Sequence, residues 1–116
     1  MNNEENKVVH INLVDFKGNR ITCDHDYWLD HIANDRRNHE LEGLEDIVVA
    51  SLTKPFSGIR YFDVDYPNRM SYYGYGIITR YIKVTIKFKD NTCIGDGVIV
   101  TAYPTNNMKP HEIPEM

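Results

Sequence analysis

An alternating stretch of eight residues constrains the fold of this chain more than any other feature. From residue 81 to residue 88, side chains with a polar group alternate with apolar ones. The first set is Tyr81, Lys83, Thr85 and Lys87, and the second is Ile82, Val84, Ile86 and Phe88. Because successive side chains of a strand point to opposite faces, this pattern predicts a strand over residues 80–88. Its aliphatic face must be covered, so the chain is expected to build a sheet with a second layer.

Shorter stretches of similar composition surround this strand and predict an antiparallel meander. Strands are expected at residues 60–64, 71–75, 92–94 and 98–103, with a bend at residues 95–97. Near the N-terminus, residues 8–16 alternate over a short range, and Lys17, Gly18 and Asn19 supply turn chemistry before residues 20–23. A small hairpin is therefore expected to precede the meander.

Two segments between the hairpin and the meander have helical periodicity. Residues 28–41 carry an apolar stripe that includes Trp28 and Ile32, and residues 43–54 carry a second stripe that stops at Pro55. A run of helices followed by a run of strands is typical of α+β proteins. We expect an N-terminal hairpin and two helices packed on a curved antiparallel sheet of about four strands.

Bulk properties limit the organisation of the chain and its partners. At 116 residues, the chain fits one domain over residues 8–104, with flexible tails at residues 1–7 and 105–116. The net charge of −4 argues against binding nucleic acid through a basic field, so any basic groove must be local. The chain shows neither a signal sequence nor an apolar run of about 20 residues, which indicates a cytoplasmic protein with no membrane partner.

The side chains of the first helical segment and of the sheet form an inventory suited to RNA cleavage. His31 and His39 lie eight residues apart in that segment, and the sheet adds cations and hydroxyls such as Lys83 and Thr101. Cleavage by the ribose 2′-hydroxyl needs a base, an acid, and cations or hydroxyls against the phosphate oxygens. Histidine suits the proton transfers, while lysine and arginine suit the phosphate. This chemistry requires no metal and no cofactor.

Each of these residues also has a purely structural explanation. His31 fits a histidine at a helix surface or core edge, and His39 fits one that favours the C-terminal end of the helix dipole. Lys83 fits the solvated face of a strand, and Thr101 fits ordinary β propensity. The tyrosines could pack in a half-buried sheet. A metal site is disfavoured because Asp24, His25, Asp26 and His31 match no metal-ligand motif, and both cysteines are expected to be reduced thiols.

Three segments, taken in order, resemble the phage-associated branch of the BECR group. In the first, His31 and Ile32 are followed, after the basic Arg37, by His39. The second is a short helix that ends in a proline, and the third is the segment Val100, Thr101, Ala102, Tyr103 and Pro104. The BECR group is the compact ribonuclease fold shared by barnase, EndoU, certain tRNA-cleaving colicins and RelE. The resemblance covers roughly residues 22–105.

The resemblance implies a set of site residues and an activity. It implies a catalytic role for His31 or His39, phosphate contact by Arg60 or Lys83, and a cleft lined by Thr101 and Tyr103. Together with the residue inventory, this assigns catalysis to His31, His39, Lys83 and Thr101. The residues assigned to substrate binding are Arg37, Arg60, Tyr73 and Tyr103. We accordingly expect a metal-independent endoribonuclease of toxin type that cleaves RNA, with tRNA as one candidate, to a 2′,3′-cyclic phosphate. Such an enzyme would have an inhibitor protein as partner. It would act in its own cytoplasm, or in that of a target cell if it is part of a secreted toxin.

A second hypothesis is a non-catalytic binding or inhibitor protein from a mobile element. Its acidic surface would engage a basic protein partner. Convergence of His31, His39, Lys83 and Thr101 on one concavity would favour the enzyme, and their scatter or burial would favour the binding protein.

Overall fold

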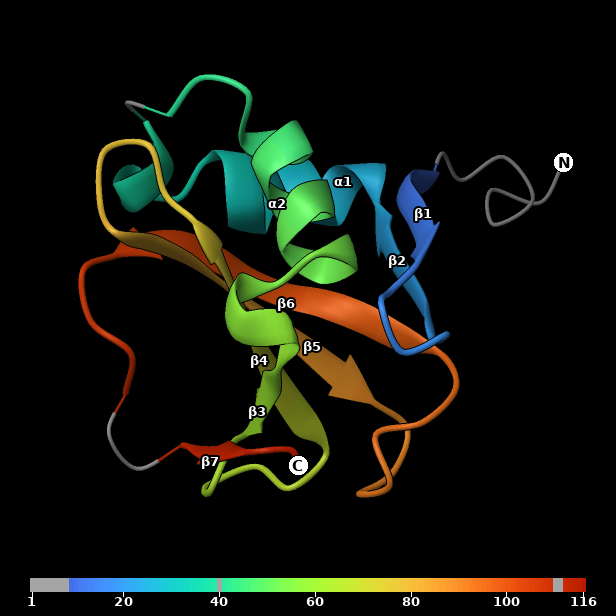
Figure 1. Ribbon diagram of the computed structural model, residues 1–116. Coiled ribbons are helices and arrows are strands. Elements are labelled where there is room, and N and C mark those ends of the chain that lie inside the picture. Colours follow the sequence, from blue (N-terminus) through green and yellow to red (C-terminus); the bar gives the residue numbers. More distant parts are fainter. Residues whose placement is uncertain (1–8, 40, 110–111) are drawn as a thin grey trace, which may run out of the picture.

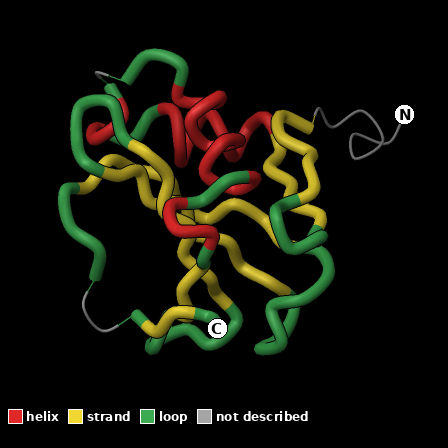
Figure 2. Tube along the Cα trace, viewed as in Figure 1, coloured by secondary structure: helices red, strands yellow, loops and turns green. Residues whose placement is uncertain are grey.

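The computed structural model describes residues 9–39, 41–109 and 112–116, so the tail expected at residues 1–7 lies outside the described residues. Its helices pack on one side of a seven-stranded, mostly antiparallel sheet, which confirms the α+β class. Figure 1 shows α1 and α2 together over the sheet, and Figure 2 shows most helical segments gathered on that side of the strands. Within the described residues, the helices are too short or too polar to cross a bilayer.

The sheet is larger than the meander of about four strands that the sequence predicts. Its strands are β1 (Val9–Val14), β2 (Arg20–Asp24), β3 (Arg60–Phe62), β4 (Arg69–Tyr75), β5 (Tyr81–Phe88), β6 (Gly97–Thr105) and β7 (Ile113–Pro114). They lie in the order β1-β2-β6-β5-β4-β3-β7, and β2 and β6 form the parallel pair. The N-terminal hairpin is confirmed as β1 and β2, and it joins the sheet through this parallel pair.

Helix α2 (Leu44–Thr53) covers the centre of the sheet, as the second helical stripe predicts. Its Val48 and Leu52 are fully buried in one cluster with Ile82, Val84 and Ile86 of β5. The aliphatic set of the alternating stretch therefore faces the helices, and burial of these side chains is the main apolar contribution to stability.

Close approach of α2 to β4 depends on Gly74. A Cβ atom at this position would lie 1.9 Å from Ser51 Oγ and 2.7 Å from Ser51 Cβ. We expect Gly74→Ala to lower the free energy of unfolding by about 1–3 kcal/mol, because the helix must shift away from the strand. Urea denaturation of Gly74→Ala, Ser51→Gly and the double variant measures this. Additive losses in the double variant would contradict the proposed steric conflict.

The single helix expected over residues 28–41 is replaced by two short pieces. These are the π-helix η2 (Trp28–Ala33), which continues directly from α1 (His25–Tyr27), and the 3-10 helix η3 (Arg36–Asn38). Asp35 adopts an extended conformation, and its carboxylate accepts a hydrogen bond from the Arg37 amide, which begins a new turn. Short polar side chains compete in this way with helix continuation. His31 and His39 therefore do not share one helix.

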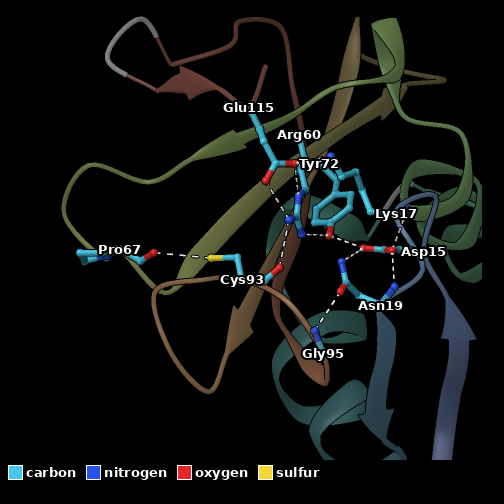
Figure 3. Close-up of polar contacts among 9 residues, drawn as sticks. All are labelled: Asp15, Lys17, Asn19, Arg60, Pro67, Tyr72, Cys93, Gly95 and Glu115. Atoms are coloured by element: carbon cyan, nitrogen blue, oxygen red, sulfur yellow. Dashed lines mark hydrogen bonds and ion pairs between the residues drawn. The ribbon is translucent and has the colours of Figure 1, made fainter.

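The C-terminal residues that were expected to form a flexible tail pack on the sheet. Strand β7 pairs with β3 at the sheet edge (Figure 1). Glu115 accepts two hydrogen bonds from the guanidinium of Arg60, at 2.8 and 2.9 Å, and Lys17 lies 3.1 Å from the same carboxylate (Figure 3). A loop replaces the strand expected at residues 92–94, and its Cys93 carbonyl accepts a further bond from Arg60.

The Arg60–Glu115 pair should make stability depend on acid pH. Hydrogen bonds from Arg60 hold the pKa of Glu115 below its usual range. The pair therefore contributes full stability above the ordinary glutamate pKa of about 4.3, and this contribution is lost as pH falls through the lower folded-state pKa. We expect Glu115→Gln to reduce the fall in unfolding free energy between about pH 5 and about pH 3. The exposed Glu42→Gln is the control, and equal pH profiles for the two variants would contradict the prediction.

Candidate functional site

The three central strands present polar side chains on the side opposite α2. Direct partners across antiparallel strands point to the same side of a sheet. The register therefore gives three rows, which are Tyr73, Lys83 and Tyr103, then Ser71, Thr85 and Thr101, then Arg69, Lys87 and Val98. We call these nine residues the polar face. Four residues that the sequence assigned to catalysis or substrate binding lie on it, namely Lys83, Thr101, Tyr73 and Tyr103.

His31 is connected to the edge of the polar face through Tyr27. The Tyr27 hydroxyl donates a hydrogen bond of 2.8 Å to the Val100 carbonyl, and the Tyr27 ring lies 4.4 Å from the His31 ring between centroids. The register between β5 and β6 shifts at Val100, which makes it the extra residue of a β-bulge. His31 is exposed, and Tyr27 links it to the residue that precedes Thr101.

Arg37 reaches the polar face from η3. Its Cζ atom lies 3.8 Å from the centroid of the Tyr103 ring, within the range of a cation–π contact. Asp35 holds the guanidinium in place through Nε at 2.9 Å and Nη2 at 2.6 Å, and this interaction lowers the pKa of Asp35. The Asn38 amide group donates to the carbonyls of Ile32 and Ala102, which fixes η3 to β6.

His39 lies in a basic depression next to Tyr103. The depression has a volume of about 570 Å³ and is lined by Arg36, Arg37, His39, Ile78, Thr79 and Pro104. The His39 side chain is exposed, and its Nε2 atom lies 3.3 Å from the Asn34 carbonyl oxygen. His39 thus lies with Arg37 at one end of β6, whereas His31 is linked to the bulge in the middle of that strand.

Lys83 and Tyr73 are held by Glu112, a residue that the sequence did not single out. Lys83 Nζ lies 2.6 Å from Glu112 Oε1, and the Tyr73 and Ser71 hydroxyls donate to the same carboxylate at 2.7 and 3.1 Å. Lys83 is 4% exposed and Glu112 is 9% exposed. Burial raises the pKa of Tyr73, so its hydroxyl stays protonated near neutral pH. The C-terminal segment therefore closes one end of the polar face.

Arg60 lies on the opposite side of the sheet from the polar face. It pairs with Tyr72 in the β3–β4 register, and it is 1% exposed. Its guanidinium donates to Tyr72, Glu115 and the Cys93 carbonyl (Figure 3), and the Tyr72 hydroxyl donates in turn to Asp15 at 2.5 Å. The structure thus places Arg60 in a buried network and not with the other predicted substrate-binding residues.

The residues that meet at β6 offer groups for proton transfer and for anion binding. Thr101 and Tyr103 supply hydroxyls, and Arg37 and Arg36 supply positive charge. The imidazoles of His31 and His39 are exposed beside these residues. Sequence reasoning missed Tyr27 and Glu112. Tyr27 could have been suspected from its position four residues before His31, which is helical spacing, whereas Glu112 lies among C-terminal prolines in a segment with no periodicity to mark it.

Among the described residues, no group of three or more histidine, cysteine, aspartate or glutamate side chains is arranged to hold a metal ion. Comparison of the chain with protein-family models, curated proteins and solved structures finds no match in any of the three.

Proposed function

We propose that this protein is a small, metal-independent endoribonuclease of toxin type with a BECR-like fold. The observation that carries the proposal is the convergence of two helical segments on β6. His31 is linked through Tyr27 to Val100, and Arg37 stacks on Tyr103. Thr101 lies between these contacts on the polar face. The sheet with helices on one side is also the architecture that the BECR resemblance implies.

The proposed reaction is an internal transesterification of RNA. The ribose 2′-oxygen attacks the adjacent phosphorus while a base removes its proton, and the bond from phosphorus to the 5′-oxygen breaks as an acid protonates that oxygen. The products are a 2′,3′-cyclic phosphate and a 5′-hydroxyl. His31 and His39 are the candidates for the proton transfers. Arg37 with the Thr101 and Tyr103 hydroxyls would stabilise the charge on the phosphate.

An enzyme of this type would cleave RNA in the cell that makes it. Because the proposed mechanism needs no metal or cofactor, the enzyme would be active as soon as it folds. We therefore infer that an inhibitor protein, an antitoxin or immunity protein, covers the polar face in the producing cell. Poor growth of cells that express the wild type, relieved in His31→Ala, would support this part of the proposal.

Incubation of the folded protein with total RNA and with tRNA in EDTA tests the proposal. Cleavage by the wild type that His31→Ala or His39→Ala reduces at least about 100-fold supports it, since removal of a general acid or base costs this much. Circular dichroism of all three proteins shows whether they are folded. Absence of cleavage by the folded wild type on every RNA would contradict the proposal.

Two observations favour the second hypothesis, a non-catalytic protein that binds a basic partner. The first is that His31, His39, Lys83 and Thr101 do not meet in one concavity: His39 lies in the basic depression, His31 is linked to the bulge, and Lys83 is buried. The second is that the three cations that the sequence assigned to the site are paired with carboxylates within the fold, Lys83 with Glu112, Arg60 with Glu115 and Arg37 with Asp35. A folded wild type that leaves RNA intact and co-purifies with a basic protein would support this hypothesis over the nuclease.

A further inference from the structure

A second depression lies on the polar face near the start of β6, whereas the basic depression lies near the end of that strand. Its volume is about 510 Å³, and its lining includes Thr22, Tyr27, Arg69, Lys87, Val98 and Val100. We call it the bulge pocket, because the β-bulge at Val100 forms part of its floor. Asp24 also lines it, and the Asp24 carboxylate caps α1 by accepting a hydrogen bond from the Tyr27 amide.

Two cations lie side by side in the lining of the bulge pocket. Arg69 of β4 and Lys87 of β5 are direct partners in the antiparallel register. Like charges at directly opposite positions repel and destabilise a sheet. Among the described residues, the structure records no carboxylate in an ion pair with either side chain. An anion bound between the two side chains would remove this repulsion.

The Arg69 side chain is partly buried beside the bulge pocket. Its Nε atom is buried and has no hydrogen-bond partner among the described residues, while its Cζ atom lies 4.3 Å from the Tyr66 ring centroid. Because Nε is buried, the guanidinium can meet a ligand in the pocket only through its outer Nη groups. Stacking on Tyr66 fixes the guanidinium plane, and planar guanidinium groups suit the paired oxygens of a phosphate.

The bulge pocket adjoins the proposed catalytic residues. Tyr27 forms part of its lining and also contacts His31, and Thr101 directly follows the Val98 to Val100 stretch of its floor. The basic depression lies beyond Tyr103, at Pro104. At about 3.3 Å per residue, the β6 segment from Val100 to Pro104 that separates the two depressions spans roughly 13 Å. A bound chain could therefore contact a basic depression on each side of the cleaved bond.

We propose that the bulge pocket binds a phosphate and the attached nucleoside that flank the cleaved bond, so that the substrate is an unpaired RNA segment of several nucleotides. This inference rests on the proposed function. Arg69 and Lys87 bind the phosphate, while Tyr27, Val98 and Val100 provide an apolar surface for the base. Unpaired RNA is favoured because its bases are free to stack on aromatic and apolar side chains.

Kinetics on a dinucleotide and on an unpaired octanucleotide test the subsite. The ratio of kcat/KM for the octanucleotide to that for the dinucleotide should fall about tenfold in Lys87→Ala and in Arg69→Ala, since a hydrogen bond to a charged group contributes this much. Lys89→Ala, an exposed lysine two residues further along, is the matched control. Lys87 is itself exposed, so its variant should fold even if Arg69→Ala does not.

A binding assay separates failure of the subsite from failure of the proposed function. The probe is a fluorescent octanucleotide with 2′-O-methyl riboses, which lacks the attacking hydroxyl. Cleavage by the wild type with an unchanged substrate ratio in Lys87→Ala would overturn the subsite alone. Absence of cleavage with probe binding that Lys87→Ala weakens would overturn the nuclease and support the pocket. Absence of both cleavage and probe binding would overturn both.

Discussion

Replacement of His31 by alanine is expected to lower RNA cleavage at least about 100-fold while the protein remains folded. The imidazole is exposed and contacts the Tyr27 ring at the edge of the polar face. Its loss removes a proton-transfer group and little buried surface. The measurement is the single-turnover rate on a defined RNA, together with a thermal melt of each protein.

The neighbouring Asp30→Ala is the matched control for His31, since Asp30 is exposed in the same π-helix. Its cleavage rate should stay close to that of the wild type. A folded His31→Ala protein that cleaves as fast as the Asp30→Ala protein would remove His31 from the mechanism. His39→Ala in the same assay shows whether the basic depression takes part in proton transfer or in substrate binding, because loss of binding would appear in KM and not in the single-turnover rate at saturation.

Lys83→Met is expected to lower the free energy of unfolding by about 3–5 kcal/mol. The Lys83 and Glu112 side chains are 5% and 2% exposed, and the substitution leaves the Glu112 carboxylate buried without its cation. Glu112→Gln should lower the free energy of unfolding by a similar amount, because it leaves the buried Lys83 ammonium group without its carboxylate. Urea denaturation of both variants measures the loss, with the exposed Lys89→Met as control.

The double variant Lys83→Met, Glu112→Gln separates a structural role of the pair from a catalytic one. It removes both charges and keeps an oxygen that can accept hydrogen bonds from Tyr73 and Ser71. We expect it to be more stable than either single variant, with a coupling free energy of about 1–3 kcal/mol. Losses that simply add would contradict the buried pair. A stable double variant that still cleaves RNA would show that Lys83 holds the C-terminal segment and has no part in the reaction.

Local patterns in the sequence predict the elements whose periodicity matches their packing. Strand β5 and helix α2 were predicted nearly to the residue, because Ile82, Val84, Val48 and Leu52 each face one shared core. The segment after Ala33 was predicted less well. Its conformation depends on the contact of Asn38 with Ala102, 64 residues away, and periodicity cannot reveal such a contact.

Contacts between distant segments also explain what was missed at the candidate site. The alternation of β5 placed Lys83 on a solvated face, but Glu112 from the C-terminal segment buries it. Arg60 has the charge expected of a phosphate-binding residue, yet the register of β3 with β4 puts it on the same side as Tyr72. Thr101 and Tyr103 share the polar face because they lie two residues apart on one strand, and that relation can be read from the sequence.

The chemistry of the RNA ends tests the central claim most directly. The folded wild type would be incubated in EDTA with a synthetic unpaired RNA, and the products would be analysed by mass spectrometry. We predict fragments with a 2′,3′-cyclic phosphate and fragments with a 5′-hydroxyl, the two products of attack by the 2′-oxygen. Fragments with a 5′-phosphate and a 3′-hydroxyl, or an RNA that stays intact, would contradict the claim.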